Sequence, residues 1–185
     1  MIKVLTITGN KPNELNITGE KDKRIEYIKK AIRKKLISFI DDGLEWVVVT
    51  GQLGIELWTC EVICELKEKY PIKLGIFPPF LEYSSRWPDI YQEKLEQMIM
   101  EADFSQPLYN QPYQGPYQFI NKDNWLIEKS DACLILGDED FPGSVKFFLD
   151  KAKKAVELYH YQIFWITPYD LEDIVNEEQD LQSFE

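Results

Sequence analysis

Residues 47–58 read Val-Val-Val-Thr-Gly-Gln-Leu-Gly-Ile-Glu-Leu-Trp. The β-branched run that ends at Gly51 predicts a buried strand, and the helical spacing of the apolar residues that follow, as far as Tyr70, predicts a helix. A strand that turns on glycines into a helix leaves the first helical N–H groups free, and the helix dipole favours an anion such as a phosphate there. These residues are therefore a candidate ligand loop.

Three residues of this loop are candidate ligand contacts. Gly51 and Gly54 would let backbone or ligand come close where a Cβ would collide. Glu56 would lie where a carboxylate can accept hydrogen bonds from ribose hydroxyls. The alternative is structural, because glycine suits a strand–helix turn by itself and the dipole favours a first-turn glutamate without any ligand. The spacing matches neither G-x-G-x-x-G nor a Walker loop.

Strands and helices alternate outward from this point. The sequence predicts strands at 2–7, 46–50, 73–77, 131–136 and 162–167, and helices at 21–41, 53–70, 89–102, 117–129 and 143–159. This alternation predicts a single α/β domain over 1–168, a Rossmann-like doubly wound parallel sheet with helices on both faces, followed by a short acidic tail at 169–185. The ligand crevice of such a sheet lies beyond the carboxyl ends of its strands, where strand order reverses.

Composition excludes several classes of protein. No apolar run approaches the roughly 18 residues of a membrane helix, and no signal-peptide pattern opens the chain. Cys60, Cys64 and Cys133 form no C-x-x-C, and His160 is the only histidine, so no metal site is expected. We interpret the cysteines as core residues in a reducing compartment, which predicts a cytoplasmic protein.

The net charge of −11 disfavours nucleic acid as a partner, because an acidic chain does not attract a polyanion by its overall field. One basic patch lies on the helix predicted from residue 21. It consists of Lys21, Lys23, Arg24, Lys29, Lys30, Arg33, Lys34 and Lys35. A solvated helix face is the favoured interpretation of this patch.

Further candidate contacts lie in other loops and on one helix. Gly9 and Lys11 follow the first strand, where a lysine can reach a phosphate or simply lie exposed. Gly143 and Ser144 open the last predicted helix, which is a second N-terminus suited to an anion or an ordinary cap. Asn124 interrupts the apolar stripe formed by Tyr117, Ile120 and Ile127, so it is either a structural amide or a contact to a base or ribose.

No Ser-His-Asp or Cys-His set is present for catalysis. General-base chemistry would therefore fall to a carboxylate, with Glu56 the first candidate and Asp131 or Asp138 behind it. Tyr113 could add a hydroxyl. The irregular segment 104–116, rich in Pro, Gln and Tyr, is of a length more often functional than accidental.

Four segments carry a resemblance to a known family. They are V-L-T-I-T-G-N-K-P-N-E-L at 4–15, G-L-E-W-V-V-V-T-G-Q-L-G-I-E-L-W at 43–58, N-W-L-I-E-K-S-D at 124–131 and G-S-V-K-F-F-L at 143–149. The chain resembles the YpsA family of Gram-positive bacteria, within a superfamily of Rossmann-like domains that includes the Smf/DprA proteins and the Lonely-Guy phosphoribohydrolases. The resemblance implies a nucleotide-derived ligand. It implies ligand loops made of Gly9, Gly51, Gln52, Gly54 and Glu56, with Asn124, Gly143 and Ser144 nearby.

The resemblance does not carry an activity with it, because the P-G-G-x-G-T-x-x-E loop and the arginine pair of Lonely-Guy enzymes are missing. A role in cell division or stress has been suggested for the family, which implies a sensor. The first hypothesis is therefore a sensor that binds a nucleotide, NAD or an ADP-ribose-like ligand. The second is an enzyme that hydrolyses or transfers an N-glycosidic bond with Glu56 as its carboxylate, and the third is a nucleic-acid-binding module. The aromatic segment 104–117 leaves a protein partner or a homodimer open.

Overall fold

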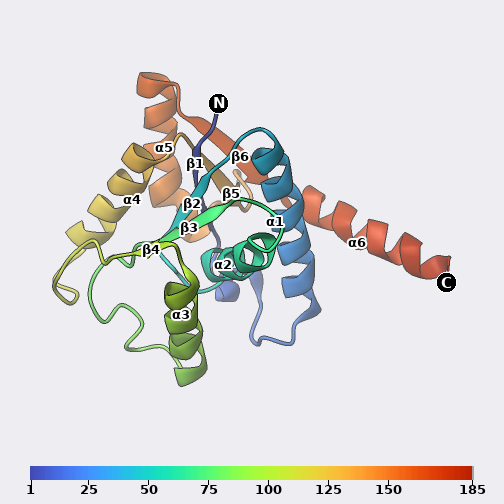
Figure 1. Cartoon of the computed structure of the whole chain (residues 1–185), viewed down its shortest axis with the longest axis horizontal. Coiled ribbons are helices and arrows are strands. Elements are labelled where there is room, and N and C mark those ends of the chain that lie inside the picture. Colours follow the sequence, from blue (N-terminus) through green and yellow to red (C-terminus); the bar gives the residue numbers. More distant parts are fainter. Residues whose placement is uncertain (185) are drawn as a thin grey trace.

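The computed structural model describes residues 1–184, which form one six-stranded parallel sheet in the order β4-β3-β2-β1-β5-β6. The strands are β1 (Val4–Gly9), β2 (Trp46–Val49), β3 (Lys73–Ile76), β4 (Phe104–Ser105), β5 (Ala132–Leu136) and β6 (Gln162–Ile166). Strand order reverses between β1 and β5 (Figure 1). The predicted Rossmann-like α/β fold is confirmed.

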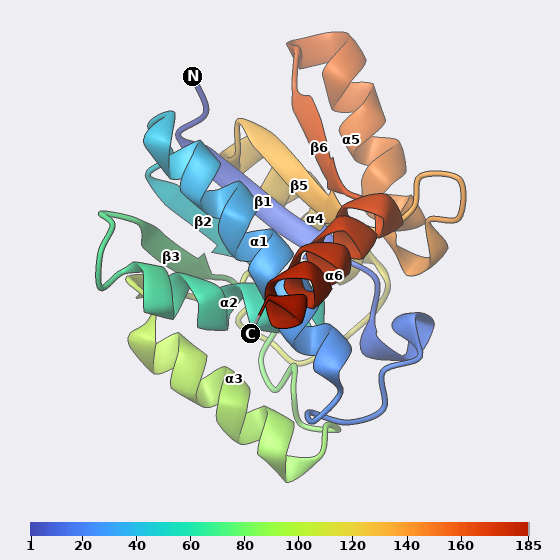
Figure 2. The ribbon, with the colours of Figure 1, turned by 90° about the vertical axis from the view of Figure 1, so that its right-hand side faces the viewer.

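Helices cover both faces of this sheet (Figure 2). They are α1 (Lys23–Asp41), α2 (Ile55–Leu66), α3 (Asp89–Glu101), α4 (Tyr117–Lys129), α5 (Lys146–Tyr159) and α6 (Pro168–Ser183), with short 3-10 turns at Pro12–Leu15 and Gly143–Val145. Helices α1, α2, α3 and α6 contribute to the core on one face, and α4 and α5 to the core on the other. Because both faces are covered, every residue of β5 is buried.

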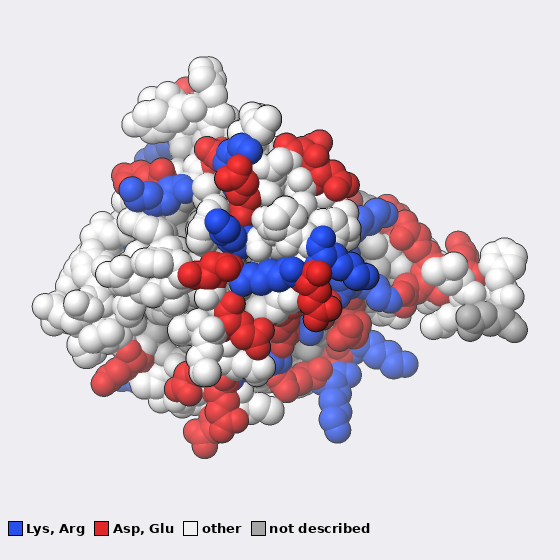
Figure 3. Space-filling view, in the orientation of Figure 1, with Lys and Arg blue, Asp and Glu red and all other residues white. Residues whose placement is uncertain are grey.

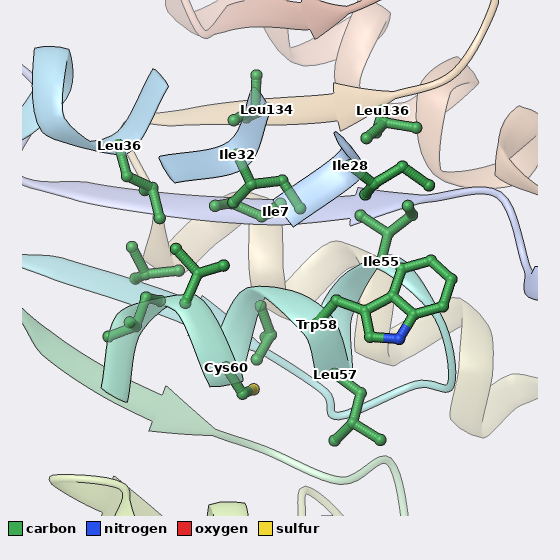
Figure 4. Close-up of a cluster of buried hydrophobic side chains, with 14 of the residues drawn as sticks. Ile7, Ile28, Ile32, Leu36, Ile55, Leu57, Trp58, Cys60, Leu134 and Leu136 are labelled. Carbon is green, nitrogen blue, oxygen red and sulfur yellow. The ribbon is translucent and has the colours of Figure 1, made fainter. Parts of the chain in front are cut away.

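The larger core lies between the sheet and helices α1 and α2 (Figure 4). Ile7 on β1 and Leu134 on β5 meet Ile32 of α1 there, and all three are at most 1% exposed. Cys60 and Cys133 are buried in the two cores as free thiols, as the sequence predicted, and the third cysteine, Cys64, is half-buried against the larger core. Burial raises the pKa of the Cys133 thiol to about 12, so this sulfur stays protonated and packs as a small hydrophobe.

Two elements differ from the predicted pattern. Strand β4 lies inside the segment predicted to be irregular, and it pairs with β3 over only two residues, which is too short to show strand alternation. The acidic segment predicted as a tail is the helix α6. It begins with a capping box in which the Asp170 carboxylate accepts from the Thr167 N–H at 2.7 Å, and it buries Ile174 against the larger core.

Four of the seven basic residues of α1 are paired with acids on the neighbouring helices. Lys29 lies 2.7 Å from Glu61 and Arg33 lies 2.6 Å from Glu65, both on α2, while Lys30 and Lys34 pair with Glu178 and Glu177 on α6. Figure 3 shows the two signs of charge interleaved over this part of the surface, and a largely uncharged surface over α4 and the segment that precedes it. The basic patch is therefore largely neutralised within the fold.

Within residues 1–184, no helix combines the length and the apolar character that a bilayer crossing requires.

Candidate functional site

A cleft of about 670 Å³ opens at the carboxyl end of β1, between α4 and α5. This is the point at which strand order reverses, where doubly wound sheets bind their ligands. We call it the switch-point cleft. It is lined by Thr8, Gly9, Lys11, Gln52, Tyr113, Pro116, Phe119, Ile120, Lys122, Asp123, Leu126, Ser144, Val145, Phe147, Phe148, Asp150, Lys151 and Lys154.

The switch-point cleft is locally positive in an acidic chain. Its lining carries four lysines, Lys11, Lys122, Lys151 and Lys154, against two aspartates. Lys151 donates to the Ile120 carbonyl at 2.8 Å, and its partial burial lowers its pKa below that of an ordinary lysine. Four ammonium groups around one hollow favour an anionic ligand.

Exposed aromatic rings border the same cleft. Phe119, Tyr113 and Phe147 are 39%, 53% and 73% exposed, although large apolar side chains usually lie inside. The Tyr113 and Phe119 rings pack on Phe80 with centroids 5.4 and 5.5 Å away, which holds them in place. Fixed rings beside lysines can receive a planar base while the lysines meet its phosphate.

The glycine turn before α2 has the backbone that its sequence predicts. Gly51 and Gly54 have φ angles of +87° and +93°, which other residues rarely adopt. A Cβ on Gly51 would lie 2.6 Å from Leu95 Cδ1, and one on Gly54 would lie 2.8 Å from Pro12 Cδ. The close approach that glycine permits here is therefore to protein atoms. Among residues 1–184, no acceptor is found for the backbone N–H groups of 51–56.

Glu56 lies behind this turn, is 3% exposed and does not line the cleft. One carboxylate oxygen accepts from the Thr50 N–H and hydroxyl at 2.7 and 2.8 Å, and the other accepts from the Thr8 hydroxyl at 3.2 Å. Because Thr8 lies one residue before the end of β1 and Thr50 follows β2, Glu56 ties two strand ends to the start of α2. The ribose contact and the catalytic role expected of Glu56 remain predictions.

The N-terminus that opens α5 is occupied by the protein itself. The Glu14 carboxylate accepts from the Ser144 N–H at 2.7 Å and from the Ser144 hydroxyl at 2.6 Å, and Lys11 N–H donates to it at 2.7 Å. Partial burial alone would raise the pKa of Glu14, but these hydrogen bonds lower it by more. Gly143 has a φ of +59°, and a Cβ there would lie 2.5 Å from the Glu14 oxygen.

Asn124 is exposed, so the expectation of a buried amide is wrong. Ile120, one turn earlier on the same stripe, is 50% exposed. The inward face of α4 is instead formed by Asp123 and Leu126, one position away. Asp123 lines the cleft, and the sequence analysis did not identify it. It lies four residues after Phe119 and three before Leu126, a spacing that places the three residues on one face of a helix.

The structure brings four of the predicted contacts to the cleft: Gly9, Lys11, Gln52 and Ser144. Tyr113 joins them. Asp131 is at the opposite end of the sheet, where its carboxylate accepts from the Lys3 and Val4 N–H groups at 2.8 Å each. Residues 1–184 contain no cluster of His, Cys, Asp or Glu that could hold a metal ion.

A second hollow lies on the other side of the glycine turn. This groove, of about 500 Å³, is bordered by the 12–20 loop, by Gly54 and Trp58 of the α2 region and by Tyr91 and Lys94 of α3. Its polar rim is already paired, because Lys94 binds Glu20 at 2.8 Å and Glu61 at 2.7 Å. The groove therefore has less unpaired positive charge to attract an anion than the switch-point cleft has.

A solved structure with a similar fold is DNA processing protein A from Helicobacter pylori, which is described as binding single-stranded DNA. It matches with a TM-score of 0.55 and 12% sequence identity, over 96% of this chain and 80% of that one. Identity this low establishes the shared fold alone.

Sequence relatives are much closer. The UPF0398 protein OB1025 of Oceanobacillus iheyensis is 53% identical over 176 residues, 95% of each chain. The UPF0398 protein BCAH820_1652 of Bacillus cereus strain AH820 is 45% identical over 179 residues, 96% of this chain and 97% of that one. The profile of YpsA, described as "YspA SLOG family", matches residues 5–171. With this match over most of its length, the chain belongs to the YpsA family of SLOG proteins.

Proposed function

We propose that this protein binds a nucleotide or nucleotide-derived ligand, such as NAD or ADP-ribose, in the switch-point cleft and acts in the cytoplasm as a sensor of that ligand. The observation that carries the proposal is the set of four lysines and exposed aromatic rings around one cleft, in a chain of net charge −11. Lysines match phosphate and rings match a base, so the two together favour a nucleotide over a simple anion.

The hydrogen bonds and the position of Glu56 favour a sensor over an enzyme. Its carboxylate already accepts three hydrogen bonds from Thr8 and Thr50 and lies outside the cleft lining. An N-glycosidic hydrolase or transferase, the second candidate, would need this carboxylate at the reacting carbon, and it would have to give up those donors first. The ligand would instead change a partner-binding surface, for which we propose the exposed rings of 104–117, facing a regulator of cell division or stress or a second copy of the chain.

The test is calorimetric titration of AMP, NAD and ADP-ribose into wild type and two variants of adjacent α5 residues. Lys154 lines the cleft, whereas Lys153 faces away from it and pairs with Glu139 at 3.0 Å. Lys154→Gln should weaken binding about fivefold, since one exposed charge contact contributes roughly 1 kcal/mol. Lys153→Gln should bind as wild type does.

Four results would overturn the sensor proposal. If wild type binds no nucleotide, or if both variants lose affinity equally, the cleft is not the site. If chromatography of the titrated samples finds released base, the protein is an N-glycosidic enzyme and not only a sensor. If the protein binds single-stranded DNA or RNA with an affinity that falls steeply with salt, while mononucleotides do not bind, the ligand is nucleic acid.

A further inference from the structure

Asp123 is the one residue of the buried polar class in 1–184 whose side chain makes no hydrogen bond. The half-buried Glu61 also has a buried oxygen, Oε2, without one, and Lys29 Nζ lies 2.7 Å from it on α1, away from the cleft. The eight buried polar or charged residues are Thr6, Thr8, Asn10, Thr50, Glu56, Thr59, Gln118 and Asp123. The first seven all make side-chain hydrogen bonds within the protein. Asp123 is 6% exposed, its Oδ1 is fully buried, and no group donates to it in hydrogen-bond geometry. Lys122 Nζ lies 2.9 Å from that oxygen, so the contact is one of charge.

Leaving a buried carboxylate without donors is unfavourable, because the donors it had in water are not replaced. A buried polar atom of this kind is uncommon in folded proteins, and its usual partner is a bound water, an ion or a ligand. Asp123 lines the switch-point cleft together with Phe119 and Leu126 of the same helix. A ligand in the cleft is therefore in a position to supply that donor.

The surroundings of Asp123 indicate which part of the ligand it meets. Its negative charge repels a phosphate, whereas Lys11 and Lys154, which come from the β1 loop and from α5, attract one. A bare anion would leave the carboxylate unsatisfied. The cleft therefore matches a ligand that carries an anionic group and a neutral hydrogen-bond donor on the same molecule.

We propose that Asp123 determines the specificity of the switch-point cleft by accepting a hydrogen bond from a neutral donor of the nucleotide, either a ribose hydroxyl or an amino group of the base. This inference rests on the proposed function and names the residue that would select its ligand. It assigns Asp123 a role distinct from that of a counter-ion to Lys122. A counter-ion would alter the affinity for every anion alike, while a specificity residue alters the preference between ligands that differ in one donor.

The experiment measures that preference by calorimetry with three probes. They are AMP, its 2′,3′-dideoxy analogue, and purine riboside 5′-monophosphate, which lacks the exocyclic amine. Wild type should prefer AMP over one of the two analogues by about tenfold to a hundredfold, as expected for a hydrogen bond to a charged acceptor. The analogue that is rejected identifies the donor as the ribose diol or the amine.

Asp123→Ala should reduce this preference to less than about threefold, since the acceptor is gone. Asp123→Asn, which keeps the shape and a neutral acceptor, should retain an intermediate preference and covers the case in which the alanine variant does not fold. Asp150→Ala is the matched control, because Asp150 borders the same cleft but is exposed and pairs with Lys146 at 3.0 Å. It should shift the affinity for all three probes alike and keep the wild-type preference.

The outcomes separate this inference from the proposed function. If wild type binds AMP but shows no preference, or if Asp123→Ala retains the full preference, Asp123 is a counter-ion and the inference is overturned while nucleotide binding stands. If wild type binds none of these probes and neither NAD nor ADP-ribose, the proposed function itself fails. Loss of the preference in Asp123→Ala with its retention in Asp150→Ala supports the inference.

Discussion

Two helices of this protein follow a glycine turn at the carboxyl edge of the sheet: α2 starts directly after Gly54, and α5 follows the 3-10 turn that begins at Gly143. The backbone N–H groups of these two turns are in opposite states. At α2, the N–H groups of 51–56 find no acceptor in the described residues, and the nearby carboxylate of Glu56 turns inward to Thr8 and Thr50. In the turn before α5, the Glu14 carboxylate accepts from both the N–H and the hydroxyl of Ser144. In one turn the backbone N–H groups have no protein acceptor among residues 1–184, and in the other a carboxylate of the same chain accepts from Ser144.

This contrast shows what a glycine-opened helix does and does not indicate. In both turns glycine supplies the positive φ that the backbone needs. Whether the N–H groups remain available is decided by an acid elsewhere in the sequence. Glu14 lies 130 residues before Ser144, a separation that no local pattern can reveal. The conformation of the turn is thus set by local sequence, whereas the pairing of its N–H groups depends on the whole fold.

The largest effect should come from the inward carboxylate at α2. Glu56→Gln replaces an acceptor of three hydrogen bonds by an amide that presents a donor to some of the same groups, so we expect the free energy of unfolding to fall by about 2–3 kcal/mol. Glu65→Gln is the control on the same helix. Glu65 is exposed and pairs with Arg33 at the surface, so its loss should cost less than about 1 kcal/mol in denaturant unfolding.

Equal and small losses in these two variants would contradict the structural role of Glu56. The expected loss also bears on the interpretation of ligand binding. A Glu56→Gln protein that fails to bind a nucleotide has not shown that Glu56 contacts the ligand, because the neighbouring glycine turn has lost its anchor. Binding assays with this variant therefore need a stability measurement beside them.

A smaller effect is expected in the turn before α5. Glu14→Gln should lower the free energy of unfolding by less than about 1 kcal/mol, because the pair is exposed, but it should speed hydrogen exchange of the Ser144 amide. In wild type, acid should likewise lower the free energy of unfolding and the protection of the Ser144 amide relative to its intrinsic exchange rate. The folded pKa of Glu14 is lowered, so its contribution is complete above the ordinary glutamate pKa and is lost as the pH falls through the lowered value. A Ser144 amide whose protection changes with neither the variant nor acid would break the comparison.

Much of the fold follows from short-range pattern. The β-branched run before Gly51 and the amphipathic segments between strands predict a parallel sheet with covered faces, and β2 and α4 lie within one residue of their expected bounds. Helix α6 was not predicted, because its acidic composition conceals the few apolar positions, such as Ile174, that pack on the core.

The candidate site was predicted less completely than the fold. Strand ends place Lys11, Gln52 and Ser144 in one cleft, since parallel strands share a carboxyl edge. The sequence favours Asn124 because this residue interrupts an apolar stripe on α4. In the structure that stripe is on the outer side of the helix, where Tyr117 and Ile120 are exposed. Asp123, one position away, faces inward. Apolar character alone could not distinguish the two faces of α4, because the outer face of this helix is apolar as well.

The claim that a nucleotide binds in the switch-point cleft is tested most directly by an NMR titration of ¹⁵N-labelled protein with AMP. The cleft and the second groove are lined by different residues, so their backbone amide signals distinguish the two sites. Our account predicts that the largest shifts fall on Gln52, Lys122, Asp123 and Leu126, in and around the switch-point cleft. Shifts that concentrate instead on Ile17, Thr18 and Tyr91 would place the ligand in the second groove and contradict it.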